Sequence, residues 1–218
     1  MRIAHLSPLL LVVAAASNAA ADPHNELTIG SFDRALHSSS ANAVTSDSLG
    51  GGALAYARKI DLGLVPGLQT WATANLAWGS ADGTMFTTMT TQLETLGFSF
   101  GGRARYPIYS DHLVAGARID LGPSRTALTL REGARELYDK GWGLATTAAL
   151  SLDLLAYAGS SFRFGLRTEL GYTLTSAVEL APTEAKDGST IQLPMSQATL
   201  GHLDVGGKFF SLTVVSQF

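Results

Sequence analysis

The last nine residues of the chain impose the strongest constraint on its fold. One face of this stretch carries Phe210, Leu212, Val214, Ser216 and Phe218, and the other carries Ser211, Thr213, Val215 and Gln217. A period of two indicates a β-strand with one apolar face. The ends of water-soluble chains tend to fray, whereas a barrel in lipid must pair its last strand with its first, because unpaired backbone is too costly there. The ending therefore predicts the closing strand of a membrane β-barrel.

Residues 1–21 have the composition of a secretory signal peptide. Met1-Arg2 supplies a basic start, and residues 9–16 form an apolar run that is too short to cross a bilayer as a helix. Residues 19–21 are all alanine and fit the small-residue rule for cleavage before Asp22. We therefore expect export, loss of residues 1–21 and one mature domain over residues 22–218. With no cysteine at the cut, a lipid anchor on the mature N-terminus is not expected.

The composition narrows the classes of function. The formal charge of −3 gives no reason to expect a nucleic acid partner. The chain has no Cys, so disulfides and thiolate metal sites are excluded, and no cofactor is expected. No segment after residue 22 has the long apolar run of a transmembrane helix. Membrane β-barrels lack such runs, because every second residue faces the lumen.

Eight strand-like windows predict the topology. They lie near residues 26–36, 50–60, 68–78, 92–106, 112–121, 142–155, 162–174 and 199–218. Short connections, near 61–67, 107–111 and 156–161, alternate with long ones at 37–49, 79–91, 122–141 and 175–198. With both termini in the periplasm, all short turns fall on the periplasmic side and all long loops outside, as in membrane barrels. The predicted fold class is all-β, an eight-stranded antiparallel transmembrane up-and-down β-barrel.

The seventh window determines which face meets lipid. One side carries Phe162, Phe164, Leu166, Thr168, Leu170, Tyr172 and Leu174, and the other carries Arg163, Gly165, Arg167, Glu169, Gly171 and Thr173. A shift by one residue would turn two arginines and a glutamate toward lipid, at about 2–4 kcal/mol for an arginine at the bilayer midplane. The apolar side is therefore predicted to face outward. The third window is ambiguous, because Trp71 shares a face with polar residues.

The same rule applied to every window predicts a polar set inside the barrel: Arg103, Arg105, Arg118, Asp120, Asp153, Arg163, Arg167 and Glu169. An eight-stranded barrel is only wide enough for side chains to fill it, and buried charges require partners. Asp153 is within cross-strand reach of Arg163 or Arg167. We expect a salt-bridged plug, and the excess of arginine over acid favours a second hypothesis, a narrow anion-preferring path.

Aromatic residues near the window ends are typical of the girdles at membrane interfaces. Tyr106, Tyr157, Phe162 and Phe218 are expected at the periplasmic rim, and Trp78, Trp142 and Tyr172 nearer the outer one.

The long connections give weaker signals. Within 122–141, Arg135/Asp139 and Glu136/Lys140 have the i,i+4 spacing of a short helix, although Gly133 and the mixed charge favour a solvated loop. Met85, Phe86 and Met89 in 79–91 are placed to touch lipid or a hydrophobic ligand, and 38–48 is expected to be flexible. A bulge at Gly206-Gly207, or protrusion above the membrane, is expected because Lys208 would otherwise face lipid.

Signals for catalysis are weak, and no catalytic residue is predicted. His37 and Ser39 match the His-x-Ser of outer-membrane lipid A deacylases, but they lie in a Ser/Asn-rich loop without a carboxylate partner. Ser110, Asp111 and His112 are adjacent, so their side chains point apart.

The closing Phe218 and the alternate apolar positions before it resemble the last strand of bacterial outer-membrane β-barrel proteins. Across nearly the whole chain, the eight-window pattern is similar in plan to the transmembrane domain of outer membrane protein A and to the OmpX and OmpW families. The resemblance implies insertion by the barrel assembly machinery, contact with outer-membrane lipid and lipopolysaccharide, and a structural, adhesive or minor transport role. A plugged scaffold, a small pore and a lipid-modifying enzyme remain the alternatives; a water-soluble carrier barrel would need a polar exterior.

Overall fold

The computed structural model describes residues 22–45, 47–60, 62–63, 65–85, 89–133, 135–180, 183–184 and 202–218. Eight long strands dominate this part of the chain: β1 (Asn25–Leu36), β2 (Ser48–Ile60), β3 (Gln69–Met85), β4 (Met89–Tyr109), β5 (Leu113–Glu132), β6 (Arg135–Ala158), β7 (Arg163–Thr175) and β11 (Gly207–Gln217). The short elements are α1 (Ser39–Val44), β8 (Val178–Glu179), β9 (Thr183–Glu184) and β10 (His202–Leu203).

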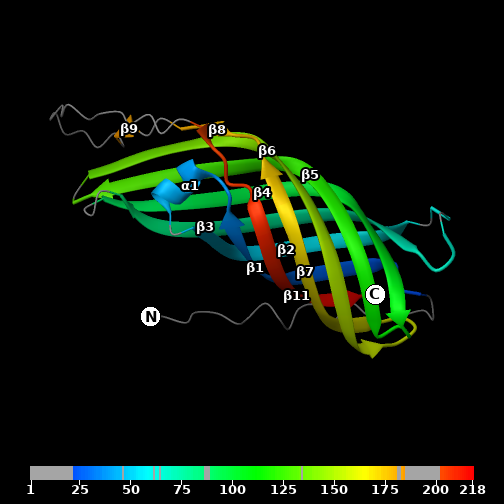
Figure 1. The fold of residues 1–218 in the computed structure, drawn as a ribbon. Helices are drawn as coiled ribbons and strands as arrows, with labels where there is room; N and C mark the ends of the chain where they lie inside the picture. The colour runs from blue at the N-terminus through cyan, green and yellow to red at the C-terminus, as the bar shows by residue number, and fades with distance from the viewer. Residues whose placement is uncertain are drawn as a thin grey trace.

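The eight long strands form a closed antiparallel ring in which each strand pairs with its neighbours in sequence (Figure 1). The ring is closed by β1 and β11, which are paired from Glu26 with Gln217 to Leu36 with Gly207. Beyond this ladder, Asn25 and Phe218 exchange two backbone hydrogen bonds of 2.8 and 2.9 Å. The predicted eight-stranded transmembrane up-and-down barrel is confirmed, and the chain's final strand closes it.

Side chains alternate between the two faces of the wall as the seventh window predicts. On β7, Leu166 and Leu170 are exposed on the outer wall, while Arg167 and Glu169 are buried inside. The third window is also settled, because Trp71 lies on the inner face with 2% of its surface exposed. Among the described residues, no helix is both long and apolar enough to cross a membrane.

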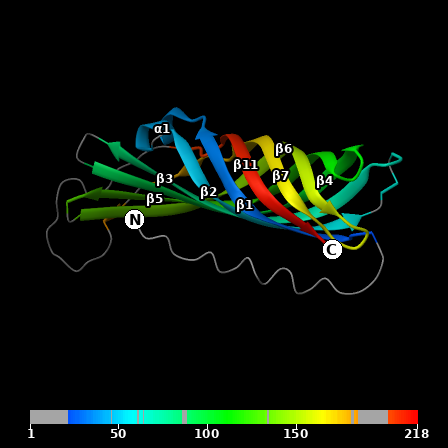
Figure 2. The same cartoon turned by 90° about the horizontal axis from the view of Figure 1, so that it is seen from below.

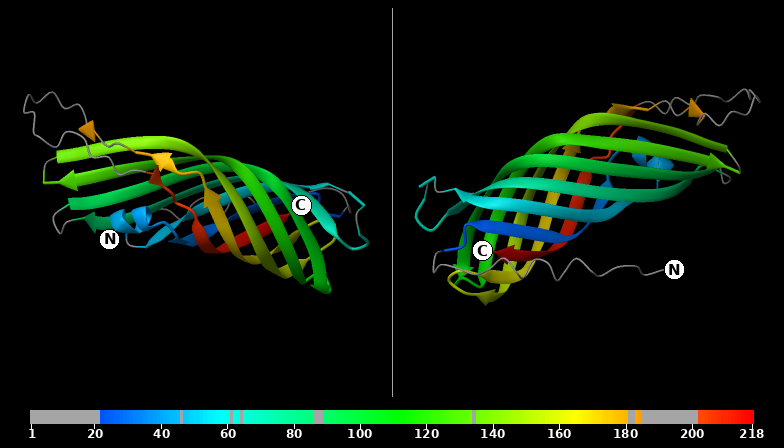
Figure 3. Two further views of the ribbon diagram at one scale, coloured as in Figure 1. Left: turned by 45° about the horizontal axis from the view of Figure 1, so that its top comes forward. Right: turned by 180° about the vertical axis from the view of Figure 1, so that it is seen from behind.

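The connections at the two ends of the barrel differ, as expected. At the end that holds Asn25 and Gln217, which we call the proximal end, the strands are joined through residues 61–68, 110–112 and 159–162. At the opposite, distal end, β3–β6 project past the other strands beside α1 (Figures 1 and 3). From below, β1, β11 and β7 lie side by side along the wall (Figure 2).

Two of the expected long loops are strands. Residues 79–85 and 89–91 extend β3 and β4, and most of 122–141 extends β5 and β6, so that these two hairpins are connected by residues 86–88 and 133–134. The expectation of a helix or solvated loop near residues 130–140 is wrong: Arg131 and Glu136 face each other across the hairpin at 2.8 Å, and Gly133 has a positive φ of 61° at the turn.

The sequence pattern does not predict these strand extensions, because in them the polar residues face outward and the apolar residues face inward. On β3 the outward residues change from Trp78 to Ser80 and Asp82, and on β4 they change from Leu96 to Glu94. Over the same stretch the inward residues become apolar, including Leu93 on β4 and Leu128 on β5. The outer wall is therefore apolar only along the membrane-spanning part, and above it the strands enclose an ordinary apolar core.

This second core defines what we call the distal lobe, which comprises the inverted ends of β3–β6 and the distal ends of β1 and β2, together with α1, β8 and β10. Its buried residues are Leu36, Ala41, Val44, Leu49, Ala81, Leu93, Leu128, Leu130, Val178, Leu180, Leu203 and Val205.

Segments expected to be loose contribute to the distal lobe. Residues 39–44, expected to be flexible, form α1, and Ala41 and Val44 are buried in the core. Met85 and Met89, expected to touch lipid or a ligand, pack against this core; Phe86 lies outside the described residues.

The start of β11 resolves the expected irregularity near Gly206-Gly207. The pairing of β11 is continuous from Gly207, with no bulge, and Lys208 is exposed at the distal end of the outer wall. Of the expected window 199–218, the barrel strand occupies only Gly207–Gln217.

The outer wall provides a test of the membrane register. Replacement of outward-facing Leu166 by arginine, Leu166→Arg, is expected to lower the unfolding free energy by about 2–4 kcal/mol, because the charge enters hydrocarbon. The matched change Ser80→Arg, also outward but beyond Trp78, is expected to cost about 0–1 kcal/mol. Denaturant titration of the refolded proteins in lipid vesicles measures both, and equal losses would contradict the register.

Candidate functional site in the barrel lumen

Glu26 is the centre of a buried ion-pair network inside the barrel. It lies on the inner face of β1 and only 1% of its surface is exposed. Its carboxylate accepts hydrogen bonds from Arg103, Arg105 and Arg167 at N–O distances between 2.6 and 3.1 Å. Gln217 on the closing strand adds a fifth bond at 2.8 Å. One carboxylate thus ties together β1, β4, β7 and β11.

Asp153 on β6 is the second acceptor in this proximal part of the network. Arg167 lies directly opposite on β7 and binds it through two nitrogens at 2.6 and 2.8 Å. Arg105 donates to the same carboxylate at 2.6 Å. Of the two arginines considered for Asp153, its partner is Arg167.

The distal part of the network is centred on Arg118. This guanidinium forms a bidentate pair with Glu169, from Nη2 to Oε2 at 2.9 Å and from Nε to Oε1 at 3.1 Å, and a salt bridge with Asp120. Glu169 also accepts from Arg103 at 3.3 Å, which joins the two parts. Thr73 and Asn75 on β3 donate to Asp120 at 2.6 and 3.0 Å.

The network is electrically balanced. It contains four arginines (Arg103, Arg105, Arg118 and Arg167) and four carboxylates (Glu26, Asp120, Asp153 and Glu169). Charge taken out of water requires both a counter-charge and hydrogen bonds. Here each ion has at least one partner of opposite sign, so the network carries no net charge.

Two corrections to the predicted lumen set follow. Arg163 is on the inner face but at the proximal rim, where it pairs with Asp22 at 3.2 Å and Asp111 at 3.5 Å rather than with the network. The predicted set does not include Glu26, although the alternation of residues in the first window indicates its orientation. Glu26 and Thr28 face inward, while Leu27 and Ile29 face outward. With both changes, the network has as many carboxylates as arginines.

The aromatic residues lie near the two ends of the outer wall. Trp78, Tyr106, Trp142 and Tyr157 are exposed on it, whereas Phe162, Tyr172 and Phe218 are half-buried. The rings of Tyr157 and Phe162 are 6.2 Å apart at the proximal end. Two further exposed tyrosines, Tyr56 and Tyr109, belong to the same outer surface.

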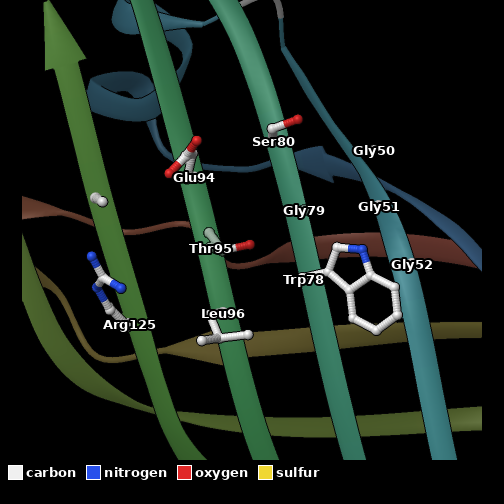
Figure 4. A pocket seen from close by; sticks show the side chains of 11 residues that line it. Gly50, Gly51, Gly52, Trp78, Gly79, Ser80, Glu94, Thr95, Leu96 and Arg125 are labelled. Carbon is white, nitrogen blue, oxygen red and sulfur yellow. The ribbon is translucent and has the colours of Figure 1, made fainter.

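A groove of about 550 Å³ crosses the outer face of β2–β5 where the wall changes from apolar to polar (Figure 4). Gly50, Gly51 and Gly52 leave its floor without side chains. The indole of Trp78 lies over Gly52, where a Cβ would come within 2.5 Å of the ring. Glu94 and Arg125 supply the charged groups on the other side, and Arg125 donates to the Tyr138 hydroxyl at 2.8 Å.

The residues considered for catalysis are not assembled into a site. His37 is exposed before α1, and its backbone N–H binds the Gly206 carbonyl. Within the described residues no carboxylate forms an ion pair with His37, and Ser39 is exposed on α1. Ser110, Asp111 and His112 occupy an exposed proximal turn, where the His112 ring binds the Leu155 carbonyl at 2.8 Å.

Ring closure, the apolar outer wall and the ionic interior define the class of fold as a small transmembrane β-barrel. No family model and no curated protein matches the sequence. The chain is similar in structure to Ail, the attachment invasion locus protein of Yersinia pestis, with a TM-score of 0.50, 9% identity and coverage of 90% of this chain and 97% of that chain. This likeness concerns the fold.

Two further solved structures match less well. Ail in complex with the heparin analogue sucrose octasulfate gives a TM-score of 0.47, 8% identity and coverage of 90% and 97% of the two chains. The β domain of the Bordetella autotransporter BrkA gives a TM-score of 0.42 and 10% identity, with coverage of 89% of this chain and 99% of that chain.

The network provides a test of the site. Glu26→Gln removes one negative charge from among three arginines and is expected to lower the unfolding free energy by about 3–5 kcal/mol, as for a broken buried ion pair. Arg163→Gln at the rim, where both acidic partners are about half exposed, is expected to cost about 0–1 kcal/mol.

The double variant Glu26→Gln/Arg167→Met restores the balance of charge and is expected to recover part of the loss, because the two residues are in contact. Denaturant titration in detergent measures all three variants. A Glu26→Gln protein as stable as the rim variant would show that the network does not hold the interior together.

Proposed function

We propose that the protein is an integral outer-membrane β-barrel of a Gram-negative cell with a structural or surface-interaction role, and that its lumen is plugged by the ion-pair network. The observation that carries the proposal is the balanced set of four arginines and four carboxylates, all of them buried except Arg118, which is half-buried. Eight strands leave an interior that side chains fill. Export through the periplasm and insertion by the barrel assembly machinery belong to the same proposal and rest on residues 1–21 and the Phe218 ending.

The surface role is assigned to the distal lobe. Its apolar core holds the ends of β3–β6, and its outward face carries polar residues such as Ser80, Asp82 and Glu94. Binding residues are often presented on rigid scaffolds of this kind. We propose no catalytic activity, because His37 and Ser39 have no carboxylate partner within the described residues.

The second candidate function is a narrow anion-preferring pore. Its basis in the sequence was the excess of arginine, which the addition of Glu26 and the rim position of Arg163 remove from the network. A balanced, hydrogen-bonded interior favours the plug over the path, because conduction requires ions to enter and leave sites that are not already paired.

Planar-bilayer recording separates these functions. The refolded wild type is expected to show almost no conductance, whereas Glu26→Ala/Arg167→Ala, which removes two facing side chains from the centre of the plug, is expected to show discrete openings. Regular anion-preferring openings in the wild type, reversed in preference by Arg118→Ala, would instead establish the pore.

We further propose that outer-leaflet lipopolysaccharide is a partner and that its sugar headgroup occupies the groove at Trp78. An exposed indole face, a guanidinium and a carboxylate together suit a phosphorylated sugar, since aromatic rings combine apolar area with defined geometry and arginine pairs with phosphate. The site lies where the outer wall changes from apolar to polar, so acyl chains would extend along Leu76 and Phe98.

Lipid retention tests this partner. After purification in mild detergent, the double variant Trp78→Ala/Arg125→Gln is expected to retain lipopolysaccharide about tenfold less tightly than wild type, equivalent to about 1.4 kcal/mol. Trp142→Ala is the matched control, because Trp142 does not line the groove. Native mass spectrometry measures bound lipid, and equal loss in the control would reduce the effect to general interfacial anchoring.

A further inference from the structure

Arg34 is a charged residue inside the barrel that the network does not include. It lies on the inner face of β1, between Phe32 and Leu36, both of which contact or belong to the distal-lobe core. The network lies on its proximal side and the apolar core on its distal side. Arg34 is thus half-buried at the junction of the two parts of the molecule.

The contacts of Arg34 do not neutralise its charge. Its Nη1 donates to the Val205 carbonyl at 3.4 Å, and its guanidinium carbon is 5.4 Å from the centre of the Phe32 ring. Its Nε is buried and has no hydrogen-bond partner. Within the described part of the chain, no carboxylate forms a salt bridge with Arg34.

The nearby acids are committed elsewhere. Asp33 points to the outer wall. Asp204 accepts hydrogen bonds from the Thr175 hydroxyl and from the Gly206 backbone, the latter at 2.8 Å. The four carboxylates of the network are already matched by its four arginines. Arg34 therefore adds one positive charge beside a network that is itself neutral.

Two cavities adjoin this unpaired cation. Their volumes are about 90 and 60 Å³, and both are lined by Phe32, Arg34, Ala77, Ser99, Thr147 and Thr173. Thr147 and Thr173 share a hydrogen bond of 3.1 Å between their hydroxyls; one of them donates to the other, which leaves the second hydroxyl with its proton for a further acceptor. The first cavity is also lined by four charged residues of the network, Arg103, Arg118, Arg167 and Glu169, so its charged lining is mainly positive.

We propose that these cavities bind one small monovalent anion, such as a halide, with Arg34 as its cationic partner. An unpaired charge that is largely removed from water is expensive, and an anion close to the guanidinium would offset that cost by direct attraction. Serine and threonine hydroxyls supply neutral donors. Because the anion must shed its hydration shell to enter, a weakly hydrated ion such as bromide fits better than fluoride. The site does not depend on the plug: it holds an ion whether or not the lumen conducts.

Stability in different salts tests the site. The unfolding free energy of the refolded wild type is expected to rise with bromide at constant ionic strength, with gluconate, which is too large for the cavities, as the balancing anion. The rise follows the linkage relation for a ligand that binds only the folded state. In Arg34→Gln, the apparent affinity for bromide is expected to fall at least tenfold, while Arg58→Gln, at an exposed position of β2, leaves it unchanged.

A crystal of the wild type grown in bromide gives a measurement that requires no variant. An anomalous peak within hydrogen-bond distance of the Arg34 guanidinium is expected. Stability that is indifferent to bromide, together with no peak at Arg34, would mean that water alone fills the cavities and would overturn the proposal. A bromide response that persists in Arg34→Gln would place the anion elsewhere and overturn it too. Neither result bears on conductance, which tests the plug separately.

Discussion

Neutralisation of charge inside a narrow cylinder is the constraint on which the rest of this structure depends. Glu26 accepts from three arginines and from Gln217, and its partners come from strands on several sides of the ring. Removing ions from water is tolerated only with close pairing and full hydrogen bonding. The inner face therefore specifies not only which residues point inward but also which strands must be opposite one another. The apolar outer wall makes the barrel compatible with lipid, and the ionic interior determines its register.

The same strands have two different outer surfaces, one that faces lipid and one that faces water. Along the membrane-spanning part, apolar side chains face outward and ions face inward; beyond Trp78 and Leu96 the polarity reverses, and Leu93 and Leu128 face inward. No break in the strands accompanies the change, since β3 pairs with β4 without interruption from Gln69 to Met85. The distal lobe is thus a continuation of the barrel wall with an ordinary apolar core, closed by α1 and the short β8–β10 pair.

The sequence predicts the barrel itself well, because the cost of arginine in lipid leaves one register for β7, and the Phe218 ending identifies the closing strand. It fails where that cost no longer applies. The inverted pattern of residues 79–85 and 122–132 predicts loops, and the i,i+4 spacing of charges in residues 135–140 predicts a helix. In the structure these residues are strands, and Arg131 pairs with Glu136 across the hairpin. Within the candidate site, the alternation of inward and outward residues predicts seven of the eight network members. It does not predict how far along the barrel axis a residue lies: Arg163 faces inward like Arg167, yet it lies at the rim. Glu26 escaped because it stands at the edge of its window.

The position of Glu26 has a consequence for how the barrel assembles. It is in the first strand, and its partners Arg103, Arg167 and Gln217 are 77, 141 and 191 residues further along the chain. Until the final strand arrives, a partly built sheet exposes arginines and acids that have no complete set of neighbours. Contacts so distant in sequence slow the search for the native state, but they also penalise every incomplete intermediate. Ring closure and charge pairing therefore occur together, because the last nine residues supply both the backbone pairing of β11 with β1 and the Gln217 contact to Glu26.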